Sequence, residues 1–138
     1  MGSVIPIKKS ANSAYLDLKN ILNYRLDSVE KLIRLKLKSD VELIKEMSDY
    51  HLNSGGKRIR ALLTMGAAKL GGYNRGSRDI NLAACVELIH SATLLHDDVI
   101  DESKLRRGVK TTNAIWGNQS PILVGDYLLS RCFEMMVE

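Results

Sequence analysis

Three aspartates lie close together in the second half of the chain. Asp97 and Asp101 are four positions apart, so a helix would place both carboxylates on one face, with Asp98 beside them. Like charges at this spacing repel each other, and a bound cation would offset the repulsion. Oxygen-only donors favour magnesium, which fills its remaining positions with water and phosphate oxygens. The motif indicates a magnesium site for a phosphorylated ligand. From the spacing alone, a solvated acidic helix end remains an alternative.

His90 lies about two helical turns before these aspartates. At about 100° per residue, Asp97 and Asp101 each fall within about 20° of His90 on a helical wheel. A histidine on an apolar helix is more often a satisfied core residue than a ligand-binding residue. Its alignment with the acids favours contact with a diphosphate.

Two basic segments flank the aspartates in the sequence. Arg106 and Arg107, followed by Gly108, present two guanidinium groups that can each bind a separate anion. Upstream, Lys57 and Arg60 follow a Gly-Gly pair and would share a face at the start of a helix, where backbone N–H groups also favour anions. We interpret both as phosphate-binding segments. Taken singly, the Arg-Arg-Gly segment could be an exposed basic loop, and the Gly-Gly-Lys-Arg segment could be a surface turn.

Most of the chain carries apolar residues at three- and four-residue steps, which predicts amphipathic helices. The predicted helices span 10–38, 40–53, 57–70, 77–101 and 121–138, and a polar loop spans 102–112. Asp40 and Ser77 are expected to cap the second and fourth helices. The third helix is apolar nearly all round, so we expect it to be buried. The predicted fold class is all-α, an antiparallel bundle of five or six helices in a single domain over 1–138.

Composition narrows the function further. A formal net charge of +4 suits anionic ligands. Nucleic acid is a weaker alternative, because no run interleaves aromatic and basic residues and no zinc-finger spacing occurs. Cys85 and Cys132 show neither disulfide-framework nor metal-site spacing, which favours a reducing cytosol. No apolar run approaches the roughly 18 residues of a membrane span, so we expect a soluble, cytoplasmic protein.

Four segments occur in one order along the chain: Gly-Gly-Lys-Arg-Ile-Arg (55–60), Glu-Leu-Ile-His-Ser-Ala-Thr-Leu-Leu-His-Asp-Asp-Val-Ile-Asp (87–101), Arg-Arg-Gly (106–108) and Gly-Asp-Tyr-Leu-Leu-Ser-Arg (125–131). Together they resemble the trans-isoprenyl (polyprenyl) diphosphate synthase family, and its long-chain, octaprenyl-type members in particular. The resemblance implies the isoprenoid synthase fold, with this chain as its N-terminal part. It also implies Mg²⁺-dependent condensation of isopentenyl diphosphate with an allylic prenyl diphosphate, through ionisation of the allylic C–O bond.

The same resemblance implies a role for each candidate residue. Asp97, Asp98 and Asp101 would form the catalytic aspartate-rich motif and hold the metal, with Asp97 and Asp101 as the direct ligands that bridge to the allylic diphosphate. Arg106 would bind that allylic diphosphate. The residues that match the isopentenyl diphosphate site are Lys57, Arg60, His90 and Arg107.

Product length and partners are further implications. Ala92 and Thr93, just before the aspartates, are small, and in this family small residues there accompany long products such as those that supply quinone side chains. A homodimer is implied, with transient membrane contact through the product and no transmembrane segment.

This chain departs from the family pattern at two points. Ala61 stands where many relatives have proline, which we expect to alter helix entry and not ligand chemistry. The second aspartate-rich motif of the family is missing, and Asp126 stands alone. We therefore expect these 138 residues not to turn over by themselves.

Two other functions stay open. A non-catalytic or regulatory subunit of a heteromeric synthase would keep the fold. An HD-type metal phosphohydrolase would use His90, His96, Asp97 and a later aspartate as ligands, but it leaves both basic segments unexplained.

Overall fold

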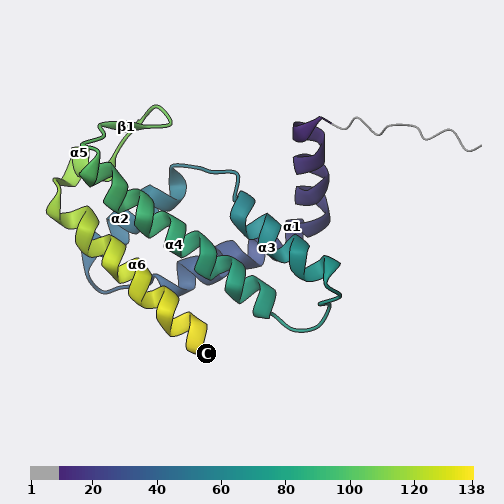
Figure 1. The fold of residues 1–138 in the computed structure, drawn as a ribbon. Helices are drawn as coiled ribbons and strands as arrows, with labels where there is room; N and C mark the ends of the chain where they lie inside the picture. The colour runs from purple at the N-terminus through teal and green to yellow at the C-terminus, as the bar shows by residue number, and fades with distance from the viewer. Residues whose placement is uncertain (1–9) are drawn as a thin grey trace, which may run out of the picture.

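The computed structural model describes residues 10–138, which form six α-helices and one two-stranded hairpin (Figure 1). The helices are α1 (Ala11–Lys36), α2 (Glu42–Asn53), α3 (Ile59–Leu70), α4 (Arg78–Ile100), α5 (Thr112–Trp116) and α6 (Gln119–Val137). The strands are β1 (Leu105–Arg106) and β2 (Val109–Lys110), which pair antiparallel. The all-α fold class predicted from the sequence is confirmed.

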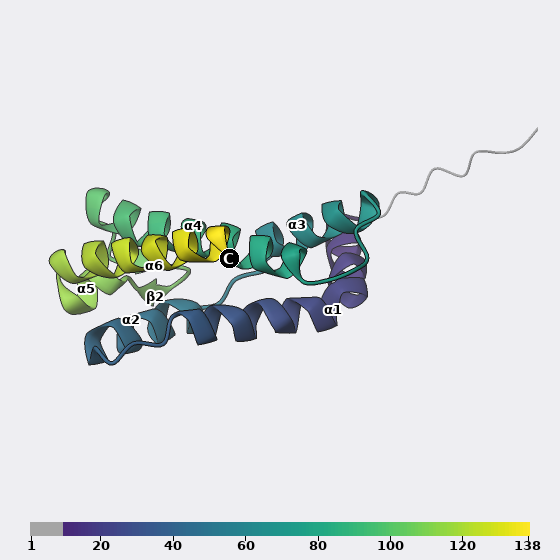
Figure 2. The ribbon, with the colours of Figure 1, turned by 90° about the horizontal axis from the view of Figure 1, so that it is seen from below.

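Helix α4 forms the centre of the bundle. It runs antiparallel beside α6 and also packs against α1 and α3. In Figure 2, α1 and α2 lie along one side of the molecule and α3, α4 and α6 along the other. The core between them holds buried apolar residues of the five longer helices, including Val29, Met65, Leu88 and Leu128. Burial of each such side chain stabilises the fold by about 1.5–3 kcal/mol, so the core fixes the position of α4.

The predicted helix starts are only partly right. Ser10 caps α1, and its hydroxyl accepts a hydrogen bond from the Ser13 backbone N–H at 3.2 Å. The expectation for Asp40 is wrong, because Val41 is the N-cap of α2 and no side chain caps that helix. Ser77 is the N-cap of α4, but its hydroxyl makes no capping bond. The Tyr73 hydroxyl accepts from the Arg78 N–H at 3.0 Å, so a side chain from the loop before the helix replaces the Ser77 cap.

The region predicted as a loop over 102–112 contains more structure than expected. Arg107 and Gly108, both with positive φ (52° and 77°), form the two-residue turn between β1 and β2. The short helix α5 follows, and the Thr111 hydroxyl caps it by accepting from the Ala114 N–H at 3.3 Å. One and a half helical turns are too short for a period of 3.6 residues to be recognised. Helix α6 begins at Gln119, before the predicted Pro121.

The prediction that the third helix is buried is wrong within the described chain. Ala61, Leu62 and Met65 are buried, whereas Leu63 is 59% exposed and Leu70 is 91% exposed. Apolar side chains on α6 are exposed as well, among them Phe133. Over residues 10–138, no helix is both long and apolar enough to span a bilayer.

Candidate functional site

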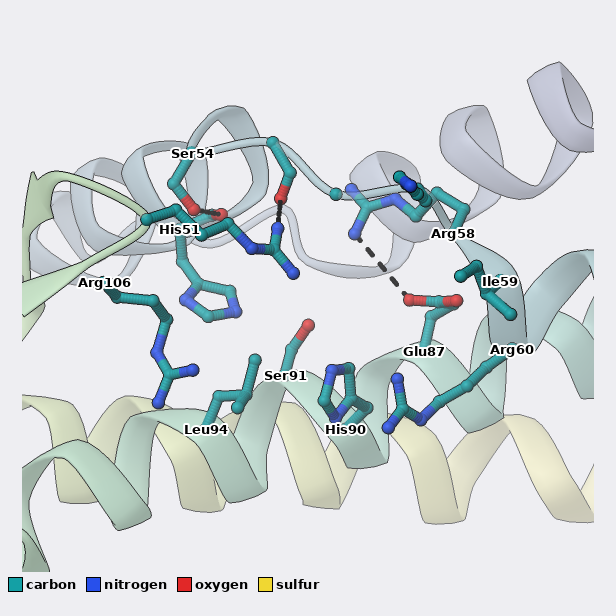
Figure 3. A pocket seen from close by; sticks show the side chains of 14 residues that line it. His51, Ser54, Arg58, Ile59, Arg60, Glu87, His90, Ser91, Leu94 and Arg106 are labelled. Carbon is teal, nitrogen blue, oxygen red and sulfur yellow. Dashed lines mark hydrogen bonds and ion pairs between the residues drawn. The ribbon is translucent and has the colours of Figure 1, made fainter. Parts of the chain in front are cut away.

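A pocket of about 540 Å³ lies between the loop that joins α2 to α3, helix α4 and the hairpin (Figure 3). Five of its lining residues are basic and one is acidic. The lining consists of His51, Ser54, Gly55, Gly56, Lys57, Arg58, Ile59, Arg60, Glu87, His90, Ser91, Leu94, Arg106 and Arg107. Both basic segments found in the sequence therefore meet in one cavity, together with His90.

The Gly-Gly loop takes a conformation that only glycine adopts without strain. Gly55 and Gly56 have φ values of 88° and 155°, and Arg58, the N-cap of α3, is left-handed at 49°. Lys57 thus precedes α3 and does not lie in its first turn, which corrects the predicted helix start. Its ammonium group lies 5.6 Å from the centre of the Tyr15 ring, and its carbonyl accepts from the Tyr15 hydroxyl at 3.3 Å.

Arg58, the one basic lining residue without a predicted role, has a structural role. Its guanidinium donates to Glu30 on α1 and forms an ion pair of 3.8 Å with Glu87 on α4. Glu87 is buried and also accepts from the Ala61 N–H at 3.0 Å. The only acid in the pocket lining is therefore already paired with Arg58, and it does not neutralise the other four basic residues of the lining.

Arg106 and Asp98 form a two-point ion pair at the other end of the pocket. The Arg106 Nη2 lies 2.6 Å from Asp98 Oδ1, and its Nε lies 3.0 Å from Oδ2. The hydrogen bonds to Asp98 raise the pKa of Arg106. Asp98 is buried, so this pair fixes β1 to the C-terminal end of α4.

Asp97 and Asp101 are exposed at that same end of α4. Neither forms an ion pair within residues 10–138, and the last turn of α4 has no basic residue to offset the negative end of the helix dipole. In the described chain, no group of three or more His, Cys, Asp or Glu side chains is arranged to hold a metal ion by itself. Two free carboxylates fit a divalent cation that takes its other ligands from water and a diphosphate, whereas Asp98 is committed to Arg106.

His90 lines the pocket from α4, and Arg107 lines it from the hairpin. Burial, followed by the charge of Arg60, lowers the pKa of His90. The Arg107 guanidinium donates to the Gly55 carbonyl, and a Cβ added to Gly56 would lie 3.0 Å from its Nη1. Arg107 therefore closes the hairpin over the loop, and the second glycine makes room for it.

His51 is a pocket residue that the sequence reasoning missed. It lies in the last turns of α2, and burial, followed by the charge of Arg58, lowers its pKa to about 4. The signal available in the sequence is its spacing, four residues after the buried Met47 and four before Gly55. Ser54 and Ser91 also line the pocket without having been singled out.

The remaining predicted residues lie outside the pocket. Ala92 is buried in the core, whereas Thr93 is exposed on α4 and its hydroxyl donates to the His90 carbonyl at 2.8 Å. His96 turns towards α6, where its Nε2 lies 3.1 Å from the Ile122 carbonyl. A Cβ on Gly125 would come within 2.3 Å of the same nitrogen, so the His96 ring occupies that space. This contact gives no support to a metal site built on His96 and Asp97.

Comparisons with known proteins identify similar chains. The family model described as polyprenyl synthetase matches residues 41–138. The chain is 48% identical over 108 residues to octaprenyl diphosphate synthase of Escherichia coli (strain K12), a match that covers 78% of this chain and 33% of that protein. It is 40% identical over 132 residues to octaprenyl diphosphate synthase of Haemophilus influenzae, covering 96% of this chain and 40% of the relative.

Two solved structures have the same arrangement of helices. A decaprenyl diphosphate synthase from Rhodobacter capsulatus superposes with a TM-score of 0.85 at 45% identity, covering 89% of this chain and 38% of that one. A polyprenyl synthase from Caulobacter crescentus, complexed with calcium and isoprenyl diphosphate, has a TM-score of 0.85 at 43% identity, with 89% and 37% covered. The chain spans 33% to 40% of the length of these relatives. It belongs to the polyprenyl synthetase family.

Proposed function

We propose that this protein binds isopentenyl diphosphate and an allylic prenyl diphosphate and takes part in their condensation to a long-chain all-trans polyprenyl diphosphate. The observation that carries the proposal is the pocket with five basic residues, whose single acid is neutralised by Arg58, next to the acidic end of α4. Clustered guanidinium and ammonium groups without free counter-charges favour a diphosphate.

Isopentenyl diphosphate is assigned to the pocket itself. Lys57, Arg60, His90 and Arg107 all line it, and they come from the Gly-Gly loop, α3, α4 and the hairpin. Their convergence from four segments supports a pre-formed site, because no ligand is needed to bring them together.

The allylic diphosphate is assigned to the acidic end of α4. Asp97 and Asp101 would hold Mg²⁺ there, and Arg106, oriented by Asp98, would bind the diphosphate from the pocket side. Bound Mg²⁺ would supply charge stabilisation to the departing diphosphate. The residues of this chain bind and orient the two anions, and none is required as a covalent nucleophile.

A long product is part of the proposal. The octaprenyl relatives support it, as does the nonaprenyl diphosphate synthase of Mycobacterium tuberculosis, which is 42% identical over 108 residues. Of the two small residues before the aspartates, Thr93 is the exposed one and Ala92 is enclosed by the core. We therefore assign Thr93 to the path of the growing chain.

Self-association and a cytoplasmic location complete the proposal. Leu123 and Phe133 on α6, 66% and 64% exposed, support association with a second copy of the chain. A heteromeric assembly is the second candidate. The chain is 39% identical over 121 residues to a Bacillus subtilis protein called heptaprenyl diphosphate synthase component 2.

Calorimetric titration with isopentenyl diphosphate tests the proposal. Lys57→Gln should weaken binding about tenfold or more, because a charge-assisted hydrogen bond contributes about 1.5–3 kcal/mol. Lys69→Gln, at the far end of α3 and outside this pocket, removes the same charge and should leave binding unchanged. Equal affinities for the wild type and both variants would contradict the proposal.

A further inference from the structure

His51 enters the pocket from α2, opposite His90 and Ser91 on α4 (Figure 3). Its ring points into the space between Arg106 and the Gly-Gly loop. Within residues 10–138, neither ring nitrogen has a hydrogen bond or an ion pair with another residue. A polar ring that is mostly enclosed but lacks a protein partner is available to a ligand.

The charges around His51 come from three other segments of the fold. Those that act on the ring are Arg58 before α3, His90 and Asp98 on α4, and Arg106 on β1. Arg107 and Glu87 line the same pocket. The Asp98 carboxylate is held by Arg106 and Glu87 is held by Arg58 and the Ala61 N–H, so positive charge dominates near the ring.

We propose that His51 is a further ligand-binding residue of this pocket, neutral in the free protein, which takes up a proton when a diphosphate enters and donates a hydrogen bond to it. The inference rests on the proposed function, since it requires that the pocket receives a diphosphate. It adds a residue for which neither the sequence motifs nor the family match assigns a role.

Proton uptake by His51 would follow from a change in the charge around its ring. In the free protein, burial and the charge of Arg58 hold the pKa of His51 at about 4, so the ring is neutral near pH 7. A diphosphate beside the ring would offset the nearby guanidinium groups and favour the imidazolium. Two ring N–H groups would then replace one, and the ligand would bind with net proton uptake.

Histidine NMR signals give a direct test, because the chain has only three histidines. In ¹H–¹³C spectra of the Cε1–H groups, the signal that disappears in His51→Gln identifies this ring. We expect it to titrate near pH 4 in the free protein and at least two pH units higher in saturating inorganic pyrophosphate without metal. An unchanged His51 titration while the His90 signal responds would overturn the inference and leave the proposed function standing.

Calorimetry in two buffers of different ionisation enthalpy gives a second test, by counting protons taken up with pyrophosphate. His51→Gln keeps a hydrogen-bond donor and should lose most of the proton uptake, whereas His51→Leu should also bind about tenfold more weakly. His96→Gln, whose ring faces α6, is the matched control and should behave as wild type. Any proton taken up by pyrophosphate itself is the same for the wild type and the variants, so it cancels when their proton uptake is compared.

The failures of the two proposals are distinguishable. Wild-type affinity and wild-type proton uptake in both His51 variants would mean that the ring only fills space, which overturns this inference alone. Absence of pyrophosphate binding by the wild type would overturn this inference together with the proposed function.

Discussion

Asp98 accepts hydrogen bonds from Arg106 at 2.6 Å and 3.0 Å, and this pair joins the acidic end of α4 to the hairpin. The middle residue of the three-aspartate motif thus orients an arginine, while its two neighbours Asp97 and Asp101 remain exposed. One short motif combines a structural acid with two acids that are free to bind a cation.

Removal of the Asp98 charge should destabilise the fold. Asp98→Asn leaves a partly buried Arg106 with weaker acceptors, so we expect a loss of about 1–3 kcal/mol in the free energy of unfolding. Urea denaturation measures it. Asp101→Asn is the control, because it removes an exposed acid from the negative end of a helix and should not destabilise. Equal stabilities of wild type and Asp98→Asn would show that the pair contributes nothing.

Divalent cations should bind at Asp97 and Asp101 when pyrophosphate is present. The Mn²⁺ signal in electron paramagnetic resonance reports free metal, and we expect Asp97→Asn and Asp101→Asn each to weaken Mn²⁺ binding about tenfold or more. Asp27→Asn is the control, because it removes an exposed aspartate on α1. The metal assignment is wrong if all four proteins hold Mn²⁺ equally well.

Acid should destabilise the protein as the pH falls from 6.5 towards 4. The folded-state pKa of His51 is about 4, below its ordinary value of 6.5, so on acidification the unfolded chain binds the proton first. The contribution of neutral His51 to the free energy of unfolding is complete above pH 6.5. It is lost as the pH falls towards 4, at up to about 1.4 kcal/mol per pH unit. The lowered pKa of His90 acts in the same direction.

Urea denaturation of the wild type and of His51→Gln at several pH values between 7 and 4 measures this dependence. The variant should show a shallower fall, because one of the two histidines responsible is gone. Parallel curves for the two proteins would contradict the assignment of the slope to His51.

Ala61 should stabilise the buried Glu87 through its backbone N–H. The 3.0 Å hydrogen bond from Ala61 to Glu87 cannot form with proline, so Ala61→Pro should lower the free energy of unfolding by about 1–3 kcal/mol. Ala61→Gly keeps the N–H and removes only a buried methyl group, so it should cost less. A proline variant at least as stable as the glycine variant would show that Glu87 does not need this donor.

The long helices and the phosphate-binding segments were predictable because their signals are local. The period of apolar residues defines α1 and α4, and the Gly-Gly pair marks the break between α2 and α3. The four residues expected to bind isopentenyl diphosphate could be named because each lies in such a motif, and all four line one pocket.

Most of the remaining features depend on contacts between distant segments. The acceptor for the Arg78 N–H is an exception, because the Tyr73 hydroxyl lies only five residues away, but the helical period does not reveal it. The pairing of Asp98 with Arg106 requires the hairpin turn at Arg107 and Gly108, and the role of His51 depends on α2 and α4 lining the same pocket. Side chains brought together by tertiary packing leave no periodic signal in the sequence.

The most direct measurement for the central claim is a ¹H–¹⁵N NMR titration of the protein with isopentenyl diphosphate. A second basic pocket of about 700 Å³, between the α1–α2 junction and α6 and lined by Arg34, Lys38, Lys45 and Arg131, is an internal control. We predict that shift changes concentrate on residues 54–60, 87–94 and 106–108. Changes concentrated around residues 34–45, or no changes at saturating ligand, would contradict the account.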